Sequence, residues 1–120
     1  MRMSLEQFEA VVEQALESIP EDLRLRLENL TVTVEDEPSR EELLDVGLDP
    51  EEETLFGLYQ GVPLPDRDPS AYSALPDRIV IYRLPLLEAC ESRRELLREI
   101  RDTVIHEVGH YFGFEDDELP

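Results

Sequence analysis

Two histidines near the carboxyl end of the chain are the residues best suited to chemistry. His106 and His110 are the only histidines in the sequence, and they are four positions apart. On a helix, residues at this spacing lie on one face about a turn apart, so both imidazoles can bind one metal ion. Glu107 completes the pattern H-E-x-x-H, in which its carboxylate acts as a base toward water activated by the metal. The spacing therefore predicts a metal site with hydrolytic chemistry.

A hydrolytic zinc site needs a third protein ligand and one open position for water. This ligand must come from beyond the helix, because one helical face cannot supply a tetrahedral arrangement. Gly113 is where the helix is expected to end, and Asp116 lies six residues after His110, where the returning chain would bring its carboxylate to the metal. The spacing favours Asp116 and one zinc ion per chain. Three acidic neighbours remain alternatives: Glu115, Asp117 and Glu118.

The elements that must position this motif follow from hydrophobic periodicity and capping residues. We expect a helix over 4–18, a short helical stretch after Pro20, strands over 30–35, 53–59 and 78–82, a helical link over 84–90, and a final helix that begins at Ser92. Ser39 and Glu42 are expected to cap one further helical turn. The apolar stripe of the final helix comprises Leu96, Ile100, Val104, Val108 and Tyr111. The two histidines flank this stripe, which suits the floor of a cleft.

A long irregular segment, 61–77, contains four prolines and separates two of the strands. Loops of this length inside a compact domain are often functional. Side chains in and near it could donate to an oxyanion or bind a substrate carboxylate, although packing or a surface ion pair is the simpler role for each. These candidates are Tyr59, Arg67, Tyr72 and Arg78.

Composition narrows the classes of partner. The chain has 30 acidic and 11 basic residues, a formal net charge of −19. A field of this sign repels nucleic acids and anionic membrane surfaces, so neither is expected as a partner. The length of 120 residues predicts a single domain, 1–120, and no apolar run is long enough to span a bilayer. We expect an acidic cytoplasmic protein in which the lone cysteine, Cys90, is a buried structural thiol.

Three segments of the chain resemble one known family. HEVGHYFGFEDDEL, LFGLYQGVPL and LPDRIVIYRLPLLEAC are similar to the small bacterial zincin-like metallopeptidases, and the resemblance extends from about Leu55 onward. It implies an α+β fold of minimal zincin type, in which a small mixed sheet packs on an N-terminal helix and a C-terminal active-site helix. It also implies that His106, His110 and Asp116 bind zinc and that Glu107 is catalytic. In zincins an exposed edge strand binds the peptide substrate, and here either GLYQGV or RIVIY is a candidate.

Two other functions remain open from the sequence. A non-catalytic acidic module, which binds metal or a basic protein, would have the same composition. A metalloendonuclease with H-x-x-x-H spacing is disfavoured by Glu107 and by the negative charge. The sequence points to a peptide or protein substrate without saying which, and it does not determine the oligomeric state.

Overall fold

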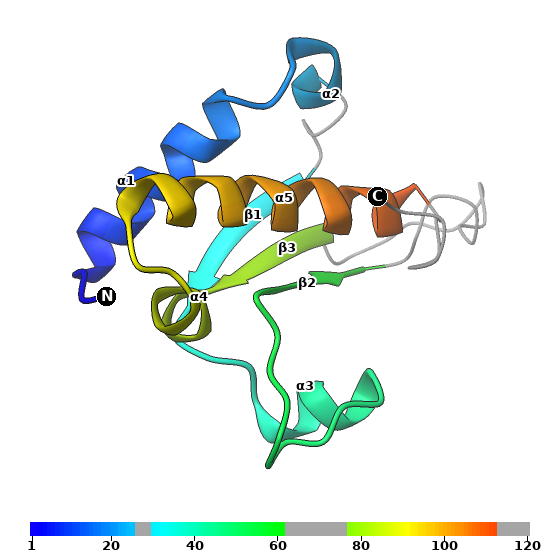
Figure 1. Cartoon of the computed structure of the whole chain (residues 1–120). Helices are drawn as coiled ribbons and strands as arrows, with labels where there is room; N and C mark the ends of the chain where they lie inside the picture. Colours follow the sequence, from blue (N-terminus) through cyan, green and yellow to red (C-terminus); the bar gives the residue numbers. More distant parts are fainter. Residues whose placement is uncertain (26–29, 62–76, 113–120) are drawn as a thin grey trace, which may run out of the picture.

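The computed structural model describes residues 1–25, 30–61 and 77–112. In chain order the elements are α1 (Leu5–Glu17), α2 (Glu21–Leu25), β1 (Leu30–Glu35), α3 (Arg40–Asp45), β2 (Gly57–Gln60), β3 (Asp77–Tyr82), α4 (Arg83–Ala89) and α5 (Arg93–Tyr111). Figure 1 shows α5 running across the sheet, with α1 beside it. In the described ranges no helix has both the length and the apolar composition needed to cross a membrane.

The three strands form one mixed sheet in the order β1-β3-β2. β1 pairs with β3 in parallel, with Val32 opposite Ile79, and β2 pairs with β3 in antiparallel fashion, with Tyr59 opposite Ile79. β3 is therefore the central strand, and β2 lies at an edge. Because GLYQGV begins with β2 and RIVIY belongs to β3, only the first of the two candidate segments lies at an edge of the sheet.

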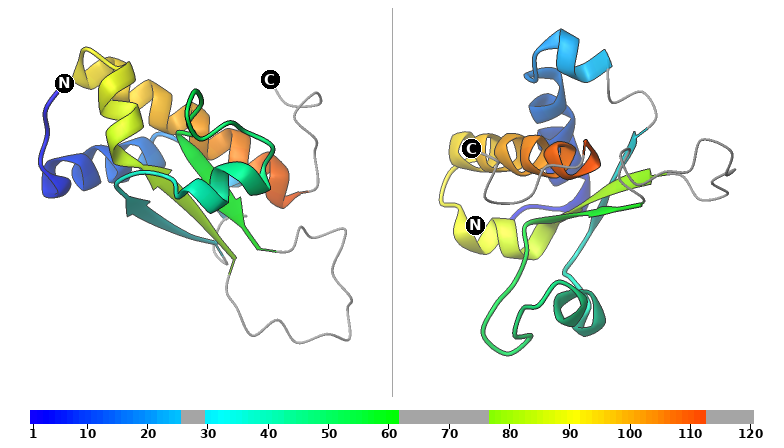
Figure 2. Two further views of the ribbon diagram at one scale, coloured as in Figure 1. Left: turned by 90° about the horizontal axis from the view of Figure 1, so that it is seen from below. Right: turned by 90° about the vertical axis from the view of Figure 1, so that its right-hand side faces the viewer.

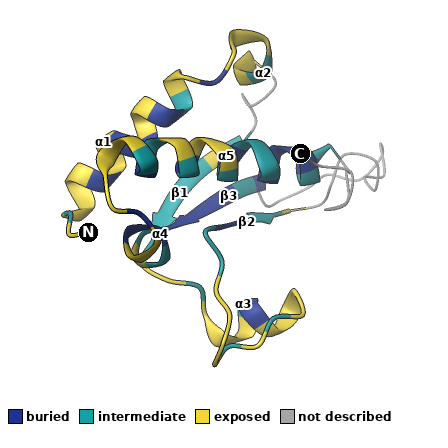
Figure 3. Cartoon of the chain, viewed as in Figure 1, coloured by how far each residue is buried: buried dark blue, intermediate teal, exposed yellow. Residues whose placement is uncertain are grey.

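Helices α1 and α5 cover one face of the sheet, and α3 lies on the opposite side (Figures 1 and 2). The main hydrophobic core fills the space between these helices and the sheet, and Figure 3 colours buried stretches of α1, α5 and β3 dark blue. From β3 this core takes Ile79 and Ile81, whereas Val80 and Tyr82 point to the other face and are also fully buried. The expected α+β arrangement of a small mixed sheet on two helices is confirmed.

The capping residues mark most helix starts correctly. Ser4 with Gln7 and Ser39 with Glu42 form reciprocal capping boxes at α1 and α3. Ser92 caps α5 by accepting the Glu95 N–H, but the Glu95 carboxylate accepts the N–H of Glu91 instead of completing the box. All five residues of the predicted apolar stripe of α5 are buried. Cys90 is also buried, as predicted.

The second strand is shorter and later than the predicted 53–59. It spans Gly57–Gln60 because β3 supplies no partner for the earlier residues. The carbonyl oxygen of Phe56 accepts the N–H of Tyr82 at 2.9 Å, and from Arg83 onward the chain turns into α4. Strand pairing therefore stops at Phe56 for lack of an opposite strand. The other two strands begin within one residue of the prediction.

A polar network holds α3 against the outer face of the sheet. The Glu42 carboxylate accepts hydrogen bonds from the Tyr82 hydroxyl at 2.9 Å and from the Gln60 side chain at 2.8 Å. Gln60 in turn accepts from Arg78 Nε at 2.7 Å. Burial opposes ionisation of Glu42, but the hydrogen bonds from Ser39 and Tyr82 outweigh it and lower the pKa of this carboxyl. The network ties α3 to β3 and to the last residue of the edge strand β2.

Candidate metal centre

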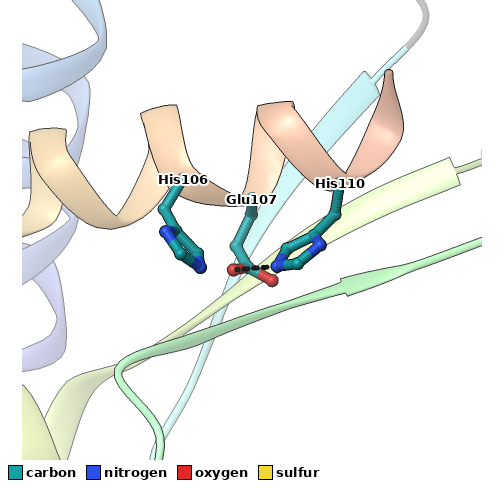
Figure 4. Close-up of side chains that lie close together, drawn as sticks. All are labelled: His106, Glu107 and His110. Atoms are coloured by element: carbon teal, nitrogen blue, oxygen red, sulfur yellow. Dashed lines mark ion pairs between the residues drawn. The ribbon is translucent and has the colours of Figure 1, made fainter. Parts of the chain in front are cut away.

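The last turns of α5 bring His106, Glu107 and His110 together. One potential ligand atom from each side chain lies within 4.8 Å of the others. The imidazole centroids are 5.0 Å apart, and His110 Nε2 is 3.9 Å from Glu107 Oε2. All three side chains extend from the same side of α5 toward β2 (Figure 4). This group is called the His–Glu–His cluster below.

The Glu107 carboxylate is anchored by the edge strand. Its Oε1 accepts the backbone N–H of Tyr59 at 2.8 Å, while its Oε2 lies on the side of His110. Glu107 is 7% exposed, whereas both histidines are half-buried. A buried carboxylate needs such a donor, because an unpaired charge away from water is costly. The bond gives Glu107 a fixed orientation at the edge of a cluster that solvent can reach.

Gly57 allows β2 to approach α5 closely enough for this bond. A Cβ at this position would lie 2.6 Å from Cγ2 of Thr103 and 3.1 Å from the carbonyl oxygen of Val80. Both distances are below ordinary van der Waals contact. Any side chain larger than hydrogen would therefore push the strand away from the helix. The glycine within the predicted strand is the one local signal of this approach that the sequence contains.

Aromatic contacts fix the end of α5 against β2. The rings of Tyr59 and Tyr111 meet edge to face, with centroids 5.9 Å apart, and the Tyr111 and Phe112 rings meet in the same way at 5.1 Å. Such pairs add to the stability that burial provides. Tyr111 is buried, as the sequence predicts. The contact keeps His110, one residue earlier, in place relative to the strand.

A cleft of about 550 Å³ opens along the cluster. All three members of the His–Glu–His cluster line it, together with residues of the edge strand. The cleft continues past His106 toward Asp102, one turn earlier on α5. Asp102 is an exposed residue on the wall of this cleft.

The donors in the cluster fit a zinc ion. Two imidazoles at i and i+4 are nitrogen donors that zinc takes in hydrolytic sites, and the Glu107 carboxylate beside them is close enough to act on a water held there. Their half-exposed position leaves room for a water and a substrate oxygen. The carboxylate that the sequence favours as third ligand, Asp116, lies outside the described residues. The same holds for its alternatives Glu115, Asp117 and Glu118.

Two of the four candidates near the proline-rich segment can be placed. Tyr59 lines the cleft and contributes its backbone N–H to Glu107. The Arg78 side chain donates a hydrogen bond to Gln60 and lies 3.7 Å from Glu35. It therefore belongs to the polar network on the side of the sheet where α3 lies. The structure thus gives Arg78 the ion-pair role that was the simpler expectation. Arg67 and Tyr72 lie outside the described residues.

Comparison with known proteins agrees with the fold and the cluster. The model of the zincin-like metallopeptidase family matches residues 27–120, so the chain belongs to this family. A solved structure of a conserved hypothetical protein from T. thermophilus is similar, with a TM-score of 0.56 and 27% sequence identity. The similarity covers 90% of this chain and 92% of that one. None of the curated proteins matches the chain significantly.

Proposed function

We propose that the protein is a zinc-dependent metallopeptidase that hydrolyses peptide bonds. His106, His110 and Asp116 would bind the zinc ion, and Glu107 would be the general base. Membership of the zincin-like family supports this reading. The observation that carries it is the buried Glu107 carboxylate, which lies next to both imidazoles and is oriented by the N–H of Tyr59. A histidine pair alone would bind metal; the oriented carboxylate adds a group that moves protons.

The chemistry divides between the metal and the chain. Zinc, when bound, would acidify water and polarise the substrate carbonyl. Glu107 accepts a proton from the water while the oxygen of that water bonds to the carbonyl carbon. The carbon–nitrogen bond then breaks, and Glu107 returns the proton to the leaving amine. The bond from Tyr59 holds Oε1 during both transfers, so that Oε2, on the side of His110, is the oxygen that carries the proton.

The edge strand β2 is the proposed guide for the substrate. It lies at the border of the sheet and lines the cleft beside the cluster. An extended peptide lying along such an edge binds through main-chain hydrogen bonds and presents alternate side chains to pockets. The carbonyl to be attacked would then lie over the His–Glu–His cluster. The substrate is therefore proposed to be a peptide or an extended segment of a protein.

The test combines metal content with turnover. We expect mass spectrometry to find about one zinc per chain in the wild type, and less in Asp116→Ala. We expect the zinc-loaded wild type to cleave members of a peptide library. Glu107→Gln should keep its zinc but lose at least about 100-fold in turnover, because the amide cannot accept the proton.

Two outcomes would overturn the proposal. A protein that takes up no zinc after reconstitution has no such site. A zinc-loaded protein that cleaves no peptide, or whose turnover is unchanged in Glu107→Gln, would instead be the non-catalytic acidic module that its charge of −19 also allows.

A further inference from the structure

The cleft continues beyond the His–Glu–His cluster into a region that the proposed chemistry does not use. On the helix side this region is bounded by Asp102 and Thr103. On the opposite side it is bounded by Val46, which follows α3, and by Leu55 and Phe56, which precede β2. The region therefore has one carboxylate wall and one apolar wall.

Asp102 gives this region its charge. It is exposed, and it precedes His106 by four residues, so both lie on one face of α5. None of the ion pairs between described residues involves Asp102. The carboxylate is thus placed to pair with a basic group that enters the cleft.

The facing wall is apolar and held in place. Val46 is 45% exposed, although valine is among the residue types most often buried in folded proteins. Leu55 and Phe56 are half-buried. Val46 directly follows α3, which the Glu42 network ties to the sheet. An apolar side chain bound against this wall would cover surface that is otherwise in water, and this burial favours binding.

The spacing relates both walls to the bond that is cleaved. Four residues of helix advance about 6 Å, so the Asp102 carboxylate lies about that far along α5 from His106. An extended peptide advances about 3.3 Å per residue. Because the cluster extends from His106 to His110, a side chain that reaches Asp102 comes from a residue about two to three positions from the reacting carbonyl. A neighbouring residue of the extended peptide can face the apolar wall.

We propose that the cleft selects peptides in which an apolar side chain adjoins an arginine or lysine, with Asp102 as the residue that recognises the basic group. This inference rests on the proposed peptidase function and specifies its substrate class. Charge complementarity supports this proposal at short and at long distance. Asp102 would pair directly with the basic side chain, and the net charge of −19 attracts basic peptides toward the molecule.

The test measures binding, so that it can be read separately from hydrolysis. Short blocked, fluorescently labelled peptides would carry leucine beside arginine, glutamine or glutamate, in both orders. Their dissociation constants would be measured with Glu107→Gln, which prevents turnover. We expect the arginine peptides to bind about 3- to 10-fold more tightly than the glutamine peptides. Adding Asp102→Asn should remove this preference, and adding Asp102→Arg should shift it toward the glutamate peptides.

Glu17→Gln is the matched control. It removes one negative charge from an exposed position on α1, outside the cleft. It should leave the arginine preference intact. A second variant, Val46→Ser, should weaken the leucine peptides but not peptides with glycine in place of leucine. Circular dichroism would check that each variant is folded.

The results separate the two proposals. Equal loss of preference in Asp102→Asn and Glu17→Gln would overturn the specificity proposal, because it would assign the effect to overall charge. Absence of any preference for arginine would do the same. Selective binding that depends on Asp102, together with a zinc-loaded wild type that cleaves none of the same peptides, would support the specificity proposal and contradict the peptidase function.

Discussion

The backbone N–H of Tyr59 donates to Oε1 of Glu107 across 2.8 Å, which joins residues 48 positions apart in the chain. One partner belongs to the edge strand β2 and the other to α5. The bond therefore couples the surface proposed to guide a peptide to the group proposed to move protons. A displacement of β2 would change the orientation of the base even if α5 stayed still.

Hydrogen exchange at Tyr59 should depend on the side chain at position 107. In Glu107→Ala the N–H of Tyr59 loses its acceptor, so its exchange should accelerate by about tenfold or more, as expected for a hydrogen bond to a charged group. Glu107→Gln keeps an oxygen acceptor and should accelerate exchange less. The measurement is amide exchange by NMR, with the amide of Val80 in the central strand as the control. Unchanged exchange at Tyr59 in Glu107→Ala would contradict the assigned bond.

Gly57→Ala should destabilise the protein by about 1–3 kcal/mol, the usual cost of overpacking. The added Cβ would meet Thr103 Cγ2 and the Val80 carbonyl oxygen, so β2 must move away from α5. Urea unfolding measures the loss. The double variant Gly57→Ala with Thr103→Ser removes the methyl group in the way, and it should recover part of the stability. No recovery would show that the strain lies in the backbone contact with Val80 instead.

Glu42 should make the protein more sensitive to acid. Its pKa is lower in the folded protein than the ordinary 4.5, so its charged form favours the fold above that value. This contribution disappears as the pH falls through the lowered pKa. The difference in urea midpoint between wild type and Glu42→Gln should therefore shrink between about pH 6 and about pH 3. A constant difference over this range would contradict the predicted linkage.

Tyr82→Phe tests the same network from its other end. Burial and the nearby Glu42 raise the pKa of the Tyr82 phenol, which therefore stays a neutral donor. Removing its hydroxyl should cost about 1.5–3 kcal/mol, the net value of one hydrogen bond to a charged group. It should also reduce the acid sensitivity that Glu42 confers. Urea unfolding at neutral and acidic pH provides both numbers, and a Tyr82→Phe protein as stable as wild type would argue against the bond.

Zinc should stabilise the fold through the two histidines. At a free zinc concentration about 100 times the dissociation constant, the expected gain is about 2.7 kcal/mol. Thermal unfolding with and without zinc measures it. His106→Ala and His110→Ala should lose nearly all of the shift, Asp116→Ala should lose much of it, and Glu17→Gln should keep it. A full shift in His110→Ala would place the metal elsewhere.

Local patterns in the sequence predicted most of the fold. Each capped helix begins where a serine and a residue three positions later can satisfy free N–H groups, and these signals require no knowledge of distant contacts. The alternating LTVTVE of β1 likewise matches its strand residue for residue. The motif on α5 predicted the His–Glu–His cluster, because helical geometry alone brings i and i+4 together.

What the sequence did not predict depends on pairing between distant segments. The start of β2 is set by where β3 ends, at Tyr82, and the choice of edge strand is set by strand order. Neither feature can be predicted from one segment of the sequence alone. The bond from Tyr59 to Glu107 uses a main-chain group that every residue except proline possesses, so no side-chain pattern announces it. The apolar wall of the cleft could not be predicted either, because it combines Val46, which follows α3, with Leu55 and Phe56, which precede β2.

The buried Cys90 can report on transient opening of the hydrophobic core. It is the lone thiol in the chain, it is 1% exposed, and it belongs to the core cluster formed with α1 and α5. Burial raises the pKa of its thiol, and reagents attack the thiolate. Labelling at Cys90 should therefore be slow and limited by exposure of this core. Its labelling rate then measures how often this core opens, without any probe being added near the His–Glu–His cluster.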